Sequence, residues 1–194
     1  MNVRGAILEK FKFRSTRDNL PWCSPHGTRT DLAELFEEID FNIGVEVGSR
    51  KGHYSKVLCQ KNPKLKLFCV DPWIAYSRLS QENQDSIYNE CVDNMKPYNA
   101  TIIRKTSMEA LKDFEDRSLD FAFIDGNHEF DYAAPDIIFW AQKVKKGGIM
   151  AVHDYYNFLG AGVVKAVDAY THCHRIYEWY CTREHDPMAF WVNV

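Results

Sequence analysis

The stretch Gly44-Val-Glu-Val-Gly-Ser-Arg-Lys-Gly52 decides the fold of this chain. An apolar run with one acidic residue, Glu46, leads into Gly48 and, after three further residues, Gly52. This order predicts a buried strand, a tight turn that needs glycine, and a helix whose first N–H groups face a ligand. A dinucleotide-binding turn reads G-x-G-x-x-G, but Glu46 stands where its first glycine would be. We therefore expect a cationic ligand rather than a pyrophosphate; a strand-turn-helix without a ligand is the alternative.

Outward from this turn, the pattern of apolar residues alternates between strands and helices. Strands are expected at 45–48, 65–70, 101–105, 119–124 and 149–152, with two final strands near 175–181 and 188–193. Helices are expected at 31–39, 53–61, 81–96, 107–114, 133–144 and 162–170, and Gly147-Gly148 is expected to end the helix at 133–144. Such alternation predicts a parallel sheet covered on both faces, and the final pair adds one antiparallel strand. Residues 1–30 lack a clean period and are interpreted as an N-terminal arm or lid, followed by one domain, 31–194.

Composition excludes several classes of protein. Of the 194 residues, 45% are hydrophobic and 26% are charged, which is typical of a globular domain. The net charge of −3 argues against a nucleic-acid partner, because such proteins usually carry a basic excess. The six cysteines form no C-x-x-C pair, which favours a reducing compartment. No apolar run is long enough to cross a bilayer or to serve as a signal peptide, so we expect a cytoplasmic protein without a membrane partner.

Four expected strands end in polar residues. Glu46 and Gly48 close the first, Asp71 the second, Asp125 the fourth, and His153-Asp154 the fifth. In a doubly wound sheet, ligands bind in the crevice outside the carboxyl ends of the strands. These residues should therefore gather around one ligand.

Two segments at this edge contain candidate contacts for a nucleoside. Asp71 follows the glycine turn by about twenty residues, where an acidic side chain accepts hydrogen bonds from a ribose; the alternative is a carboxylate that caps the loop before Pro72. Ser107 and Met108, just past the third strand, and Trp73 are placed to border an adenine ring. Met108 and Trp73 are equally well interpreted as core residues.

Four motifs together resemble a known family. They are Val-Glu-Val-Gly-Ser-Arg-Lys-Gly at 45–52, Phe-Ile-Asp-Gly-Asn-His at 123–128, Lys-Gly-Gly-Ile at 146–149 and Val-His-Asp-Tyr at 152–155. They are similar to the motifs of class I S-adenosylmethionine-dependent methyltransferases, in particular a branch of small-molecule O-methyltransferases. The resemblance covers about residues 31–194. It implies a Rossmann-like, doubly wound α/β fold with a seven-stranded, mostly parallel sheet and one antiparallel strand.

The resemblance also implies a cofactor, S-adenosylmethionine, and a set of residues to hold it. Glu46, Gly48 and the neighbouring backbone would bind the methionine part, Asp71 the ribose, and Ser107 with Met108 would lie by the adenine. The full set expected to contact the cofactor is Glu46, Gly48, Ser49, Arg50, Gly52, Asp71, Trp73, Ser107, Met108 and Asp125. A sulfonium and an ammonium are cations, so the acidic Glu46 fits this ligand.

Asp125 and Asp154 end strands that are expected to be neighbours, about 4.8 Å apart. Their carboxylates could converge on Mg²⁺ or Mn²⁺. Catechol-type O-methyltransferases, which the chain resembles, hold a divalent ion here with acidic and amide groups, whereas this chain has His153-Asp154. The expected metal ligands are thus Asp125, His153 and Asp154. A metal-free site in which His153 is a base is the alternative.

His128 is the second candidate base. It follows Asp125 by three residues, where the catechol-type pattern has its proton-accepting lysine. A histidine has an unperturbed pKa of about 6.5 and can accept a hydroxyl proton near neutral pH. The residues expected to be catalytic are therefore His128, His153 and Asp125.

The expected function is methyl transfer from S-adenosylmethionine to a hydroxyl of a small molecule. The acceptor is the expected partner, and the oligomeric state, including a homodimer, stays open. The alternative from another class is a non-catalytic module that binds the same cofactor for a regulatory or partner-binding purpose. A nicotinamide-dependent dehydrogenase is disfavoured because the first glycine of its fingerprint is missing.

Overall fold

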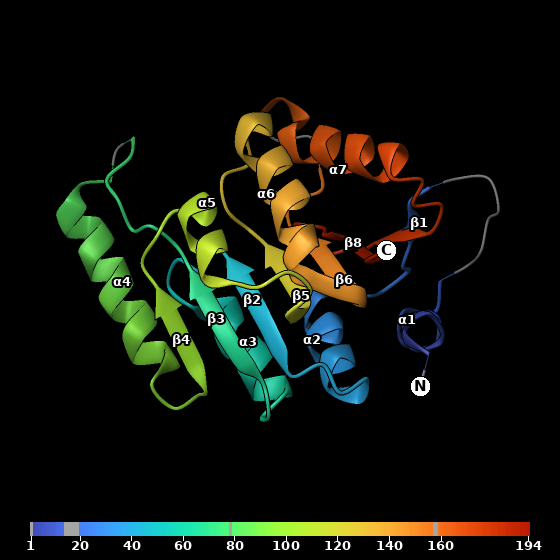
Figure 1. Cartoon of the computed structure of the whole chain (residues 1–194), viewed down its shortest axis with the longest axis horizontal. Helices are drawn as coiled ribbons and strands as arrows, with labels where there is room; N and C mark the ends of the chain where they lie inside the picture. Colours follow the sequence, from blue (N-terminus) through green and yellow to red (C-terminus); the bar gives the residue numbers. More distant parts are fainter. Residues whose placement is uncertain (1, 14–19, 78, 157–158) are drawn as a thin grey trace.

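The structure, a computed structural model, describes residues 2–13, 20–77, 79–156 and 159–194. Its centre is one sheet of eight strands in the order β1-β7-β8-β6-β5-β2-β3-β4 (Figure 1). The strands are β1 Trp22–Cys23, β2 Ile43–Val47, β3 Lys66–Val70, β4 Ala100–Ile103, β5 Leu119–Ile124, β6 Val144–Val152, β7 Trp179–Cys181 and β8 Ala189–Val192. Strand β8 is antiparallel to both neighbours, β6 and β7, and the other pairs of described strands are parallel. The expected α/β fold with one antiparallel strand is confirmed.

The number of strands differs from the expected seven. Trp22 pairs in parallel with Tyr180 of β7, and Cys23 with Cys181, which adds β1 at one edge of the sheet. A strand of two residues shows no alternation in sequence, so the pattern could not reveal it. Part of the segment expected to be an arm or lid thus lies in the sheet.

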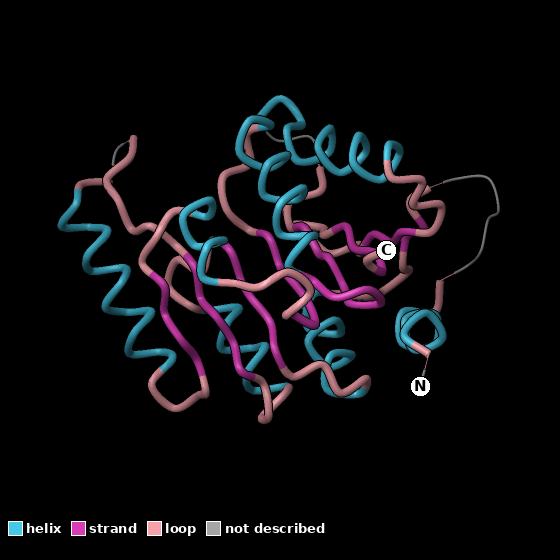
Figure 2. Tube along the Cα trace, in the orientation of Figure 1, coloured by secondary structure: helices cyan, strands magenta, loops and turns pink. Residues whose placement is uncertain are grey.

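Helices cover both faces of the sheet (Figure 2). The α-helices are α1 Val3–Phe11, α2 Arg29–Glu38, α3 His53–Lys61, α4 Gln81–Met95, α5 Ser107–Ala110, α6 Phe130–Lys143 and α7 Gly162–Cys173, with 3-10 turns η1 Leu111–Asp113 and η2 Leu159–Ala161. Residues of α1 to α4 share one buried cluster with the sheet, and residues of α5 to α7 share the other. None of the described helices combines the length and apolar content needed to cross a bilayer.

The central strand β5 shows why both faces are covered. Phe121 and Phe123 point into the cluster with α2 and α3, whereas Ala122 and Ile124 belong to the cluster with α6. The ring of Phe36 stacks on Phe121 with centroids 3.9 Å apart. Each such side chain contributes about 1.5–3 kcal/mol when it is fully buried. The apolar run at 119–124 therefore contributes side chains to the buried clusters on both faces of the sheet. Both clusters lie next to the edge where the polar strand ends meet.

The structure corrects the expectation that Gly147-Gly148 ends the helix at 133–144. The helix ends at Lys143, and the two glycines lie inside β6, which begins at Val144. The side-chain amide of Asn193 donates to the carbonyl of Ala141 at 2.9 Å and to that of Val144 at 2.8 Å. Asn193 thus satisfies carbonyls that a glycine cap would otherwise satisfy.

Candidate functional site

The glycine turn after β2 touches the end of β5. Gly48 has a φ of 93°, which L side chains rarely adopt. A Cβ at this position would lie 2.0 Å from the carbonyl oxygen of Asp125. Gly52, with a φ of 72°, then starts α3. Only glycine at Gly48 lets the turn and Asp125 approach this closely.

Glu46 lies on β2 just before the turn, and its side chain is 2% exposed. Its carboxylate accepts a hydrogen bond from the hydroxyl of Ser55 on α3. Burial raises the pKa of Glu46 to about 8, and the nearby charge of Asp125 adds to the rise. A cationic ligand beside Glu46 would offset this burial of a carboxylate, as the sequence predicted.

Asp71 holds the glycine turn by accepting two backbone hydrogen bonds. Its Oδ2 accepts from the N–H of Arg50 at 3.0 Å, and its Oδ1 from that of Trp73 at 2.9 Å. Burial raises the pKa of Asp71, although these two bonds oppose the rise. Trp73 is fully buried, and its indole N–H donates to the carbonyl of Arg50 at 2.8 Å. Trp73 therefore supports the turn from the core, and contact with a cofactor would require its ring to move.

Helix α5, which follows β4, is joined to α6 by Asp136, a residue that was not among the expected site residues. The hydroxyl of Ser107 donates to Asp136, and it accepts from the indole N–H of Trp140 at 2.8 Å. Burial raises the pKa of Asp136 to about 6. Met108, on the same helix, is 37% exposed. The sequence signal for Asp136 is that this acidic residue lies on the apolar face of a helix.

The predicted polar residues at the ends of β5 and β6 do meet. Nε2 of His128 lies 2.6 Å from Oδ2 of Asp154 and 3.8 Å from Oδ1 of Asp125. Nδ1 of His153 lies 3.2 Å from the same oxygen of Asp154 and 3.4 Å from that of Asp125. Two carboxylates and two imidazoles thus form one cluster, which we call the strand-end cluster.

The charges of the strand-end cluster shift each other's ionisation. Burial alone would raise the pKa values of Asp125 and Asp154, but the two histidines outweigh burial and hold both below the usual range. Contacts with Asp125 and then Asp154 raise the pKa of His128 to about 9. Burial lowers the pKa of His153, but the same carboxylates prevail and raise it. Asp154 also has a φ of 57°, a strained conformation that is common at functional sites.

Arg29, the first residue of α2, completes the surroundings of His153. Its Nη1 lies 3.0 Å from Nε2 of His153. A guanidinium only donates hydrogen bonds, so this contact needs a bare Nε2, whereas the two carboxylates favour the protonated ring. From the sequence, Arg29 could reach the site only if the expected arm folded over it, and the structure brings it there. Its partner His153 lies 124 residues further along the chain, so no local sequence pattern connects the two.

A comparison with known families identifies the chain at this point. A family model described as a methyltransferase domain matches residues 45–155, more than half of the sequence. The chain belongs to the class I methyltransferases. The family that the sequence motifs indicated, which uses S-adenosylmethionine, is confirmed.

Two curated relatives of this methyltransferase match part of its length. The protein y4gI of Sinorhizobium fredii is 28% identical over 116 residues, which are 57% of this chain and 13% of that protein. The protein R132 of Acanthamoeba polyphaga mimivirus is 27% identical over 133 residues, 66% of this chain and 58% of that protein. Both are named as uncharacterised. The matches span less than two thirds of either relative.

Solved structures share the fold of the methyltransferase at low sequence identity. An O-methyltransferase from Bacillus cereus in complex with S-adenosylhomocysteine aligns with a TM-score of 0.64 and 11% identity, over 100% of this chain and 90% of that one. The methyltransferase PaMTH1 of Podospora anserina gives 0.62 and 12%, over 84% and 76%. An rRNA methylase from Streptococcus thermophilus gives 0.63 and 10%, over 87% and 98%. These likenesses establish the fold of the chain.

The strand-end cluster of the methyltransferase has the chemistry of a cation site. Asp125, His128 and Asp154 each offer one ligand atom, and these atoms lie within 4.8 Å of one another. Two carboxylate oxygens and one imidazole nitrogen suit Mn²⁺, Fe²⁺ or Zn²⁺, and Mg²⁺ less well. His153, the expected third ligand, has its Nδ1 beside the same carboxylates, but its Nε2 meets Arg29. The residues present therefore fit a divalent ion.

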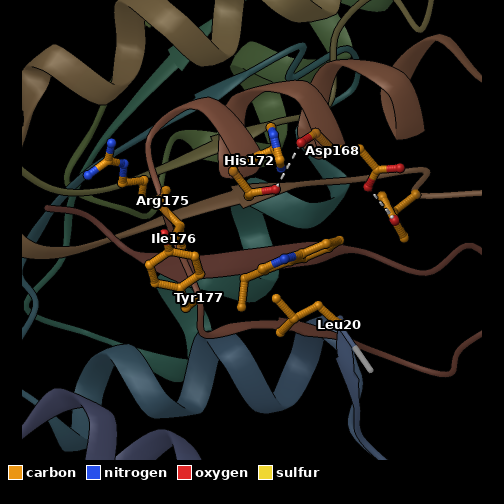
Figure 3. A pocket seen from close by; sticks show the side chains of 9 residues that line it. Leu20, Asp168, His172, Arg175, Ile176 and Tyr177 are labelled. Atoms are coloured by element: carbon orange, nitrogen blue, oxygen red, sulfur yellow. Dashed lines mark hydrogen bonds between the residues drawn. The ribbon is translucent and has the colours of Figure 1, made fainter. Parts of the chain in front are cut away.

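A separate pocket of about 450 Å³ lies beside α7 and the start of β7 (Figure 3). Its lining residues are Leu20, Tyr155, Asp168, Thr171, His172, Arg175, Ile176, Tyr177 and Trp179. The hydroxyl of Tyr155 donates to Asp168 at 2.8 Å across one wall. None of the residues predicted for the cofactor, the metal or catalysis lines this pocket.

Proposed function

We propose that this methyltransferase transfers the methyl group of S-adenosylmethionine to a hydroxyl group of a small molecule. The observation that carries the proposal is the strand-end cluster, in which Asp125, His128 and Asp154 gather beside the glycine turn. A hydroxyl acceptor must lose a proton during transfer, and carboxylates and imidazoles are the groups that receive protons near neutral pH. A cluster of this kind next to the cofactor supports O-methylation.

The cofactor is proposed to lie over the turn after β2. Glu46 would face the ammonium of its methionine part, and Asp71 would accept hydrogen bonds from its ribose. Met108 would border the adenine, with Ser107 held in place by α6. The backbone N–H of Lys51 would bind the carboxylate, since those of Gly48, Ser49, Arg50 and Gly52 already donate within the protein. The enzyme would align the sulfonium methyl with the attacking oxygen, and alignment of two bound substrates removes a large part of a reaction barrier.

Two schemes for the hydroxyl proton follow from the cluster. In the first, His128 accepts the proton in its neutral form, which dominates above its raised pKa of about 9, and Asp154, 2.6 Å away, orients its ring. In the second, Asp125 and Asp154 with one histidine would hold a divalent ion, which lowers the pKa of a bound hydroxyl. His128 can be a ligand or a base but not both at once. His153 is the weaker candidate for either role because both of its nitrogens are engaged.

Asp125→Asn and Asp154→Asn test the proposal. Either change removes a charge on which both schemes depend, so turnover should fall at least about 100-fold while the affinity for S-adenosylhomocysteine stays near that of the native protein. Turnover is measured as S-adenosylhomocysteine formed with catechol probes, with Mn²⁺ or with EDTA, and affinity by calorimetry. Asp93→Asn on α4, whose carboxylate forms an exposed ion pair with Lys96, is the matched control.

The outcomes separate the alternatives. Activity that EDTA removes and Mn²⁺ restores favours the metal scheme, whereas indifference to both favours His128 as the base. Full turnover in both Asp variants would contradict the proposed roles of the carboxylates. Tight binding of S-adenosylhomocysteine without turnover, across a library of hydroxyl acceptors, would favour the non-catalytic module instead.

A further inference from the structure

We infer that Arg29 is a positioning residue of the methyl-transfer site, which orients the imidazole of His153 toward the two carboxylates of the strand-end cluster. The inference rests on the proposed function for its effect on turnover, but not for its structural content. It assigns a role to a residue outside the segment matched by the family model, which begins at residue 45.

Three contacts, made by two residues, fix Arg29 in place. The carboxylate of Glu184, in the loop between β7 and β8, accepts a hydrogen bond from the Arg29 N–H at 2.8 Å. The hydroxyl of Tyr54 on α3 donates to the Arg29 carbonyl at 2.8 Å. The guanidinium carbon also lies 5.6 Å from the centre of the Tyr54 ring, within the range of a cation–π contact. The backbone of Arg29 is thereby held, and its side chain reaches His153.

Helix stability does not explain an arginine at this position. Arg29 is the first residue of α2, and Thr28 caps the helix by a capping box with Asp31. The N-terminal end of a helix carries partial positive charge and disfavours cations. The Arg29 side chain is also 40% exposed, and the nearest carboxylate oxygen of Glu184 is 4.0 Å from its Nε. The closest contact of the guanidinium is the one with His153.

This contact determines which nitrogen of the His153 ring carries the proton. Because Arg29 can only donate, Nε2 of His153 must accept, and the ring proton must sit on Nδ1. Nδ1 is the atom that lies beside Asp154 and Asp125. The buried ring therefore connects a cation on one side with two carboxylates on the other. The role of His153 is to hold the two carboxylates in position. His128 is then the histidine that can contact the acceptor.

Nitrogen NMR of histidine-labelled protein tests the orientation without any acceptor. The resonances of His153, assigned by their loss in His153→Gln, should show a protonated Nδ1 and a bare Nε2 in the native protein. Arg29→Met keeps the aliphatic stem but removes the donors, so Nε2 should then gain a proton. Arg29→Lys should preserve the native pattern in part. Arg183→Met, at an exposed arginine next to Glu184, is the control and should change nothing.

The effect on turnover is the second measurement. With S-adenosylmethionine and a catechol probe, Arg29→Met should lower kcat about tenfold or more, as is usual when a residue that orients a site is lost. Affinity for S-adenosylhomocysteine should stay unchanged, and added methylguanidinium should restore part of kcat in Arg29→Ala. A protonated Nε2 in the native protein, or an unchanged ring in Arg29→Met, would overturn the inference. A native protein without methyl transfer would refute only the proposed function, since the NMR result stands alone.

Discussion

At the scale of single residues, the strongest constraint is the contact between Gly48 and the Asp125 carbonyl. The sequence located both residues, because each follows a buried strand and strand ends meet at one edge. It could not locate Arg29, whose partner His153 is brought near only by folding. Local sequence pattern therefore identified the residues on the strand ends. It could not show that Arg29, from a distant part of the chain, contacts His153.

Gly48→Ala should destabilise the fold and prevent cofactor binding. A side chain at the left-handed φ costs about 1–2 kcal/mol, and the clash with Asp125 adds to that by forcing β2 and β5 apart. Gly147→Ala is the matched control, because Gly147 has a φ of 78° with nothing within 4 Å of a Cβ. Urea denaturation and calorimetry with S-adenosylhomocysteine measure the two effects. Equal losses in both variants would show that the close approach is unimportant.

Glu46 is expected to make cofactor binding depend on pH. Its pKa is raised to about 8 by burial, so the free protein carries a proton on Glu46 at neutral pH. A cationic ligand needs the ionised form, and binding should therefore release a proton. The affinity for S-adenosylhomocysteine should rise up to about tenfold per pH unit as pH increases from about 6 to 8.

Calorimetry in two buffers with different ionisation enthalpies counts the released proton. Glu46→Gln should bind more weakly and lose the pH dependence. An affinity that stays constant over this range in the native protein would mean that Glu46 does not meet a cation.

At the scale of elements, the helices and strands with a clear period were predictable, and their boundaries were less so. The helix at 53–61 and the strand at 119–124 are confirmed at both ends. Helix α6 ends at Lys143, one residue from the expected end, but the expected stop at Gly147-Gly148 was wrong, because Asn193, near the other end of the domain, satisfies the last carbonyls. No signal near the helix could show this, and two glycines nearby suggested a cap that the structure does not use.

Asn193→Ala should destabilise the protein through this boundary. The side chain is 7% exposed, and its loss leaves two buried carbonyls without these donors, which costs about 1–3 kcal/mol. The free energy of unfolding in urea measures the change. Asn99→Ala, at an exposed asparagine before β4, should stay within about 0.5 kcal/mol of the native protein. A similar small effect at Asn193 would show that the carbonyls find other partners.

At the scale of the whole molecule, the sequence predicted the layers, the mostly parallel sheet and the edge where its polar strand ends meet. It did not predict that residues 1–30 supply a strand, and it could bring Arg29 to the candidate site only if the expected arm folded over it. Trp22 and Cys23 are too few to show a strand pattern, and α1 was not expected because its apolar residues showed no clear period. The family match begins after this segment, so neither source of information could place it.

The two-residue strand β1 has a consequence for the outer rim of the sheet. It covers the free side of β7 over Trp22 and Cys23, and an uncovered strand is a template for pairing with another chain. A protein shortened to begin at residue 31 would present β7 to solvent and lose Arg29 together. Self-association and a poorly ordered catalytic centre should then arise from the same deletion.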